Sequence, residues 1–186
     1  MKKIIIPAFI VVALAQWIVP GSLIWDREEV LRRGKTFRFQ TEPVDPSNPF
    51  KGKYISLRFK ENEITLPGTK EVFENGQEVY VVLKVENGFA GIQQLSVHKP
   101  SPGTDFVTAS IYYSSPDTSA TTVFIKYPFE EYYMDEYKAP KAEDVYFKSL
   151  RDTTQKTYAQ VKVWKGRTVI EDVFIGKMPI EELINQ

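Results

Sequence analysis

From Thr36 onward the sequence alternates between apolar and polar residues, and this period of two constrains the fold more than any other feature. In an extended chain successive side chains point to opposite faces, so alternation is typical of strands with one buried face. The apolar positions of the three clearest runs are Phe37, Phe39 and Thr41; Ile55, Leu57 and Phe59; and Val79, Val81, Leu83 and Val85. We therefore expect a mainly β domain.

Glycine-containing turns separate several of these runs. Asn-Gly between two alternating runs is the strongest short-range signal for a β-hairpin, and it occurs at Asn87-Gly88 within VENGFA. A second Asn-Gly pair, Asn75-Gly76, precedes the run that starts near Glu78. The segment YAQVKVWKGRTVIEDVFI predicts another hairpin, which turns at Lys165-Gly166.

One stretch departs from the period of two. In KAPKAEDVYFKSLRD the apolar residues have the spacing of one helix face, and Pro140 suits the start of a helix. A short final turn is expected after Pro179. Roughly eight or nine strands with one inserted helix predict an antiparallel β-sandwich or a partly closed barrel.

The N-terminal segment has a different character. Lys2 and Lys3 are followed by an uncharged run from Ile4 to Trp25, which is long enough for the about 20 residues that a transmembrane helix needs. Because lysines precede the run and acidic residues follow it, the N-terminus is expected in the cytoplasm. Residues 1–25 are thus interpreted as a transmembrane anchor.

A cleaved signal peptide is the alternative interpretation of the same segment. The apolar run Ile4–Val12, followed by Ala13-Leu14-Ala15, matches a signal sequence with its cleavage site. Retention is favoured because the apolar character continues well beyond that site. Residues 26–35 then read as a helical stalk that stops at Gly34, and residues 36–186 as one extracytoplasmic β-rich domain.

Composition excludes several classes of site. The chain has no cysteine and a single histidine, His98, so thiolate chemistry and most metal or acid–base constellations are excluded. Its formal net charge of +0 gives no reason to expect a nucleic-acid partner. No phosphate-binding loop or nucleophile motif occurs, and we expect no cofactor and no metal.

The segment PVDPSNPFKGKYISLRF combines a proline-rich turn with a strand. Pro46 and Gly52 are interpreted as residues that shape the turn, whereas Leu57 and Phe59 are expected in the core. Tyr54 and Arg58 share the opposite face of the strand. They are candidate binding residues together with Asp45, with which they could form a hydrogen-bonded cluster. Asp45 could equally cap its own turn.

A second candidate region, YPFEEYYMDEYKAP, gathers tyrosines and carboxylates between Tyr127 and Tyr137. Such a segment could bind a sugar or a cationic peptide, or form an interface anchored by tyrosines. It could also be a solvated loop whose rings cover the edge of the core. Its candidate binding residues are Tyr132, Tyr133 and Glu136.

The segment GKYISLRF resembles the signature of the GDYXXLXY family of bacterial membrane-anchored proteins. The likeness extends from the entry region AQWIVPGSLIWDREEVLRRGKTFRFQTEPVDPSNPFKGKY to the closing hairpin AQVKVWKGRTVIEDVFI. It implies a protein of the bacterial cytoplasmic membrane with its domain on the extracytoplasmic side. Because members are often encoded beside multi-pass membrane proteins, it also implies an integral membrane partner.

Three positions depart from the family pattern. Asn48 stands where an aspartate is usual, Lys51 where an arginine is usual, and Lys53 where the name-giving aspartate would be. The resemblance singles out Glu136 as the glutamate of the later aromatic segment. The substitutions weaken any catalytic role of the signature itself.

Three functional hypotheses follow. The first is a non-enzymatic accessory or assembly subunit that acts with a membrane or envelope partner. The second is a module that binds envelope glycan or peptide through Tyr127–Tyr137. The third is a hydrolase that uses Asp45 and Glu136, although nothing in the sequence brings these two carboxylates together.

Overall fold

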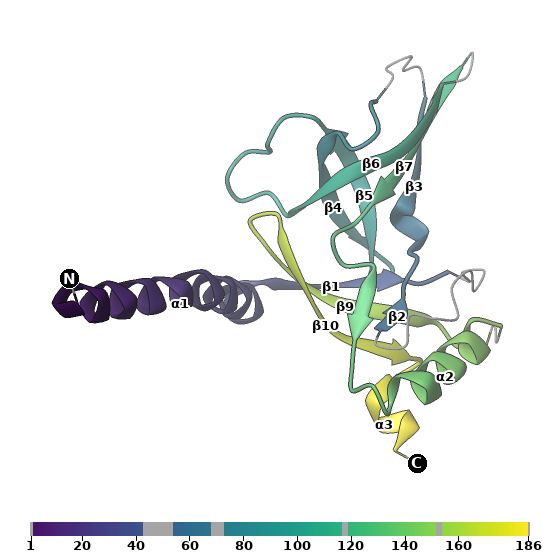
Figure 1. Cartoon of the computed structure of the whole chain (residues 1–186). Helices are drawn as coiled ribbons and strands as arrows, with labels where there is room; N and C mark the ends of the chain where they lie inside the picture. The colour runs from purple at the N-terminus through teal and green to yellow at the C-terminus, as the bar shows by residue number, and fades with distance from the viewer. Residues whose placement is uncertain (1, 43–53, 68–72, 117–118, 152–153, 186) are drawn as a thin grey trace.

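The computed structural model describes residues 2–42, 54–67, 73–116, 119–151 and 154–185 (Figure 1). In chain order its elements are α1 (Lys2–Arg33), β1 (Lys35–Gln40), β2 (Tyr54–Ser56), the 3-10 turn η1 (Lys60–Asn62), β3 (Glu63–Pro67), β4 (Glu78–Glu86), β5 (Phe89–Ser96), β6 (Phe106–Pro116), β7 (Ala120–Lys126), β8 (Glu131–Tyr133), α2 (Ala139–Arg151), β9 (Thr157–Trp164), β10 (Arg167–Ile175), β11 (Met178–Pro179) and α3 (Ile180–Ile184).

The strands form antiparallel sheets that nearly close on themselves. A five-stranded sheet has the order β3-β7-β6-β4-β5, a four-stranded sheet has the order β1-β9-β10-β11, and β2 pairs with β8. In Figure 1 the five-stranded sheet occupies the upper part of the domain and the four-stranded sheet the lower part. Isolated bridges, Thr41 to Phe59 and Val107 to Gly166, connect these units. The prediction of a mainly β, antiparallel architecture is confirmed.

One hydrophobic core lies between the sheets, and the alternation places most of its residues correctly. Phe37 and Phe39 of β1 are buried together with Val79 and Val81 of β4. The expectation that Val85 joins them is wrong, because this side chain is 56% exposed. Val85 pairs with Ala90 beside the β4–β5 turn, at the end of the hairpin.

Two tight turns have the backbone that their sequences demand. Asn87 and Gly88 have φ values of 51° and 82°, and Lys165 and Gly166 have values of 51° and 84°. Two successive positive φ angles are the signature of the type I′ turns that match strand twist. Both hairpins are therefore confirmed at the predicted residues.

The inserted helix is also confirmed. It is α2, which buries Ala142 and Tyr146 against the core, and the final turn after Pro179 is α3. In Figure 1 both helices lie at the lower end of the domain.

The first helix, α1, leaves the domain as an isolated rod (Figure 1). It ends before Gly34, whose amide donates to the carbonyl of Val30. The last two turns of α1 contact the domain, where Val30 is buried and Arg167 of β10 binds both Asp26 and Glu29. Within the described part of the chain, no helix combines the length and the apolar character needed to cross a membrane.

A matched pair of glycine substitutions tests the junction between the two sheets. An added Cβ at Gly166 would lie 2.5 Å from Phe106 and from Thr108, whereas one at Gly88 would meet nothing within 4 Å. Both residues have a positive φ, so each alanine should cost about 1 kcal/mol in backbone strain. Gly166→Ala should cost roughly 1–3 kcal/mol more, because it overpacks this contact.

The measurement is urea denaturation of the full chain, followed by circular dichroism. Equal losses in free energy of unfolding for Gly88→Ala and Gly166→Ala would show that the β9–β10 turn does not press against β6 as described.

Candidate functional site

The signature segment and the tyrosine-rich segment lie side by side. Strand β2 pairs with β8 so that Tyr54 is opposite Tyr133 and Ile55 is opposite Tyr132. The rings of Tyr54 and Tyr133 are 5.4 Å apart between centroids. The sequence predicts both segments but not this pairing, because long-range register leaves no local signal.

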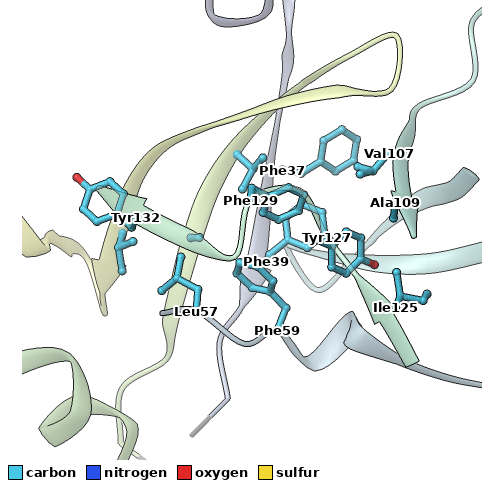
Figure 2. Close-up of a cluster of buried hydrophobic side chains, with 14 of the residues drawn as sticks. Phe37, Phe39, Leu57, Phe59, Val107, Ala109, Ile125, Tyr127, Phe129 and Tyr132 are labelled. Carbon is cyan, nitrogen blue, oxygen red and sulfur yellow. The ribbon is translucent and has the colours of Figure 1, made fainter. Parts of the chain in front are cut away.

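The inward side of the signature segment belongs to a cluster of aromatic rings (Figure 2). Phe39 packs edge-on against Phe59, Tyr127 and Phe129, with centroid distances of 5.7, 5.7 and 4.9 Å. Leu57 and Phe59 are both buried, as predicted. Aromatic pairs of this geometry contribute about 0.5–1.5 kcal/mol each beyond the area they bury, so this side of the segment is structural.

A polar network joins the signature segment to the chain before β8. The amide of Leu57 donates to the carbonyl oxygen of Glu130 at 2.8 Å. The carboxylate Oε1 of Glu130 accepts from the amide of Tyr127 at 3.1 Å and from Nδ2 of Asn62 at 3.0 Å. Burial raises the pKa of Glu130, and these two hydrogen bonds oppose that shift.

Asn62 is the centre of this network. Its Nδ2 also donates to the carbonyl of Ile125 at 2.7 Å, and its Oδ1 accepts from the amide of Phe59 at 2.6 Å. One side chain thus ties the end of the signature segment to β7 and to Glu130. Sequence reasoning missed Asn62, because an asparagine after a strand is most often only a turn residue.

A cleft of about 600 Å³ opens beside this network. Its walls come from the signature segment, from β6 and from β7, and we name it the Tyr112 cleft. The side chains that define it are Arg58, Asn62, Tyr112, Tyr113, Lys126 and Glu130. It therefore combines aromatic rings, two cations and a carboxyl group in one concave surface, which is the usual composition of a ligand site.

A second cleft, of about 650 Å³, lies on the other side of the Lys126–Glu131 segment. We name it the Arg27 cleft, because Arg27 of α1 faces Tyr133 and the β10 residues Thr168 and Val169 across it. It is bounded by the stalk part of α1 and by the domain.

The candidate residues of the tyrosine-rich segment differ in their exposure and in their partners. Tyr132 is only 9% exposed, and its hydroxyl donates to Asp172 at 3.2 Å. Tyr133 is exposed, and its hydroxyl donates to Glu131 at 2.5 Å. Glu136 is exposed in the turn before α2. A binding role for these three residues stays a prediction.

The candidate residues of the signature segment are described only in part. Arg58 is exposed and lines the Tyr112 cleft, whereas Tyr54 is half-buried beside Tyr133. Asp45, Pro46 and Gly52 lie outside the described residues. The cluster of Tyr54 and Arg58 with Asp45, and the hydrolase hypothesis that joins Asp45 to Glu136, therefore stay untested. No group of three or more potential metal ligands converges among the residues that are placed.

Burial raises the pKa of Glu61, next to Asn62, from its ordinary 4.5 to about 7. The negative charge of Glu42 raises this pKa further. The positive charge of Lys60 and a hydrogen bond from the backbone amide of Glu61 lower it. Oxygen Oε2 of Glu61 is buried without a hydrogen-bond partner in the described part of the chain. Ionisation of Glu61 is thus costlier in the folded protein than in the unfolded chain.

This shift predicts a pH dependence of stability. Because the folded pKa is the higher one, stability should be greatest below pH 4.5 and should fall as pH rises through about 7. Glu61→Gln removes the ionisation, so at pH 8 it should be more stable than the parent by about 1–2 kcal/mol, allowing for solvent screening. At pH 4.5 the two should differ much less.

Urea denaturation at both pH values measures the effect, and Glu63→Gln, at the exposed first residue of β3, is the control. A Glu61→Gln variant whose stability relative to the parent is independent of pH would contradict the burial of this carboxyl.

Comparison with known proteins gives one family. A family model described as "GDYXXLXY protein" matches residues 16–173, which confirms the resemblance seen in the signature segment. No curated protein and no solved structure matches the chain.

Proposed function

Since this chain belongs to the GDYXXLXY protein family, we propose that it is a non-enzymatic accessory subunit of the bacterial cytoplasmic membrane. Its helix α1 enters the membrane, its β-rich domain lies on the extracytoplasmic side, and an integral membrane protein is its partner. The observation that carries this proposal is the exposed apolar rod formed by α1.

Large apolar side chains are exposed along α1. Each of the following is more than half exposed: Phe9, Val12, Leu14, Trp17, Ile18, Val19, Leu23, Ile24 and Trp25. A large exposed apolar surface of this kind marks a site of contact with a membrane or with another protein. Lipid chains, together with helices of a membrane partner, are the environment that fits such a surface.

Basic residues flank the apolar run of α1 on both sides. Lys2 and Lys3 precede it, whereas Arg27, Arg32 and Arg33 follow it among Asp26, Glu28 and Glu29. Since basic residues, rather than acidic ones, set the orientation of a membrane helix, these charges do not decide it. The proposed orientation, with the domain on the extracytoplasmic side, is the one that the resemblance to the family implies.

Gln16 supplies a point of contact for a partner helix. Its amide side chain is exposed within the apolar part of α1. In a membrane such an amide is stabilised by a hydrogen bond to a neighbouring helix, worth about 0.6–2 kcal/mol. By contrast, the hydroxyl of Ser22 is already satisfied within α1, because it donates to the carbonyl of Val19 at 2.8 Å.

Membrane fractionation and photo-crosslinking of the natively expressed chain test the proposal in two steps. The chain should resist extraction by alkaline carbonate, and a crosslinker at position 13 should capture one integral membrane protein. Gln16→Leu should lower that crosslinking by roughly threefold to thirtyfold. Ser22→Ala is the control and should leave it unchanged.

Release by carbonate would contradict the membrane anchor. Retention without a crosslinked partner, or crosslinking that Gln16→Leu leaves intact, would contradict the partner contact while leaving the anchor in place.

A second candidate function is the binding of envelope glycan or peptide by the tyrosine-rich segment. The observation in its favour is the Arg27 cleft, which is lined in part by the exposed Tyr133. Tyr127 and Tyr132 are buried, so the segment offers Tyr133 and Tyr137 as its accessible rings. A glycan array probed with the parent and with Tyr133→Ala would test this function.

A further inference from the structure

Two consecutive tyrosines of β6 are both exposed, and the pairing of β6 with β7 is irregular at this point. Tyr112 is 69% and Tyr113 is 51% exposed, and neighbouring side chains in a regular strand point to opposite faces. The irregularity is a β-bulge. Ile111 pairs with Ile125 of β7 and Tyr113 pairs with Phe124, so Tyr112 is the extra residue.

The bulge turns both rings toward the same space, because Tyr112 and Tyr113 each line the Tyr112 cleft. Tyr113 also lies against Phe124, with ring centroids 6.1 Å apart. Bulges often re-aim side chains beside functional sites. The result is an aromatic wall that contributes little to the core and faces solvent.

Positive charge faces this wall. Arg58 of the signature segment and Lys126 at the end of β7 both line the cleft. Among the described residues neither has a carboxylate within ion-pair distance. The carboxyl group on this side is Glu130, whose pKa is raised by burial and lowered by Lys126, a cation that lines the same cleft.

Strand β7, which lines the cleft, is already paired on both sides. Phe124 of β7 pairs with Tyr113 of β6 and with Glu63 of β3, and Val123 pairs with Ser114 and Ile64. A peptide could not add to β7 as a further strand, because no free edge remains there. At β7 a ligand would therefore be recognised by side chains.

We propose that the Tyr112 cleft binds a saccharide that carries a carboxylate group. The C–H face of a sugar ring packs on the rings of Tyr112 and Tyr113, as apolar surface packs on aromatic faces. The carboxylate meets Arg58, whose guanidinium can bind it through two hydrogen bonds, with Lys126 adding charge. Glu130 offers its second carboxylate oxygen, Oε2, to the hydroxyls, whereas both amide hydrogens of Asn62 are already donated, to Ile125 and to Glu130.

This site shares Lys126 and Glu130 with the Arg27 cleft but uses other tyrosines, and it does not depend on the membrane anchor. The two tyrosines that it uses lie in β6, outside Tyr127–Tyr137.

Calorimetric titration of the full chain with trigalacturonate tests the proposal. The detergent must be zwitterionic and free of sugar, because a glycoside headgroup would compete for the cleft. Binding should be saturable, and uncharged maltotriose should bind at least about tenfold more weakly, because it lacks the charge-assisted hydrogen bonds to Arg58.

Variants assign the binding to this cleft. The double variant Tyr112→Ala, Tyr113→Ala and the single variant Arg58→Gln should each weaken trigalacturonate binding by at least about tenfold. Arg58→Lys keeps the positive charge but loses the planar guanidinium that can donate two parallel hydrogen bonds. Its affinity for trigalacturonate should lie between those of Arg58→Gln and the parent. Arg38→Gln, which changes an exposed arginine of β1 that lines neither cleft, is the matched control for Arg58→Gln and should bind like the parent.

Far-ultraviolet circular dichroism confirms that each variant is folded, and Tyr112→Phe, Tyr113→Phe provides a milder pair that should retain most binding. Absence of trigalacturonate binding to the parent, or binding that survives loss of both rings, would overturn the proposal. So would equal binding of maltotriose, or tighter binding of triglutamate, which would make the ligand an acidic peptide.

Discussion

The packing of Phe39 against three other rings is the contact on which the rest of the domain depends. Phe39 belongs to β1 of the four-stranded sheet, whereas Phe59 ends the signature segment and Tyr127 and Phe129 connect β7 to β8. One buried cluster therefore holds together three parts of the chain that are distant in sequence. The Tyr112 cleft and the Arg27 cleft both border the segment that this cluster fixes.

Fixing that segment also fixes the polar groups at the cleft. The backbone of Glu130 accepts a hydrogen bond from Leu57, and its carboxylate accepts from Asn62 and Tyr127. The core and the candidate site thus share Leu57 and Tyr127, which are buried on one side and bond to Glu130 on the other. A residue of the family signature can be structural and still set the shape of a binding surface.

Features that depend on neighbouring residues, such as strand alternation and tight turns, were predicted from the sequence. Features that depend on pairing between distant strands were missed. Alternation placed Phe37 and Phe39 in the core, and the preference of Gly88 for positive φ located a hairpin. The bulge at Tyr112 was missed, because Ile-Tyr-Tyr-Ser carries no local sign of an extra residue. The pairing of Tyr54 with Tyr133 was also missed, because the pairing of distant strands leaves no local signal in the sequence.

Helix α1 is attached to the domain through an arginine of β10 that binds two of its carboxylates. Arg167 binds Asp26 and Glu29 of α1 at 2.7 and 2.6 Å, and the same strand, β10, carries Asp172, which accepts a hydrogen bond from Tyr132 of β8. The hydrogen bond from Arg167 also holds the pKa of Glu29 below its ordinary value. Because β8 pairs with β2, the signature segment is linked to α1 through two strands rather than through a loose linker. The domain therefore presents a fixed face, and a partner that binds α1 would find the Arg27 cleft immediately next to it.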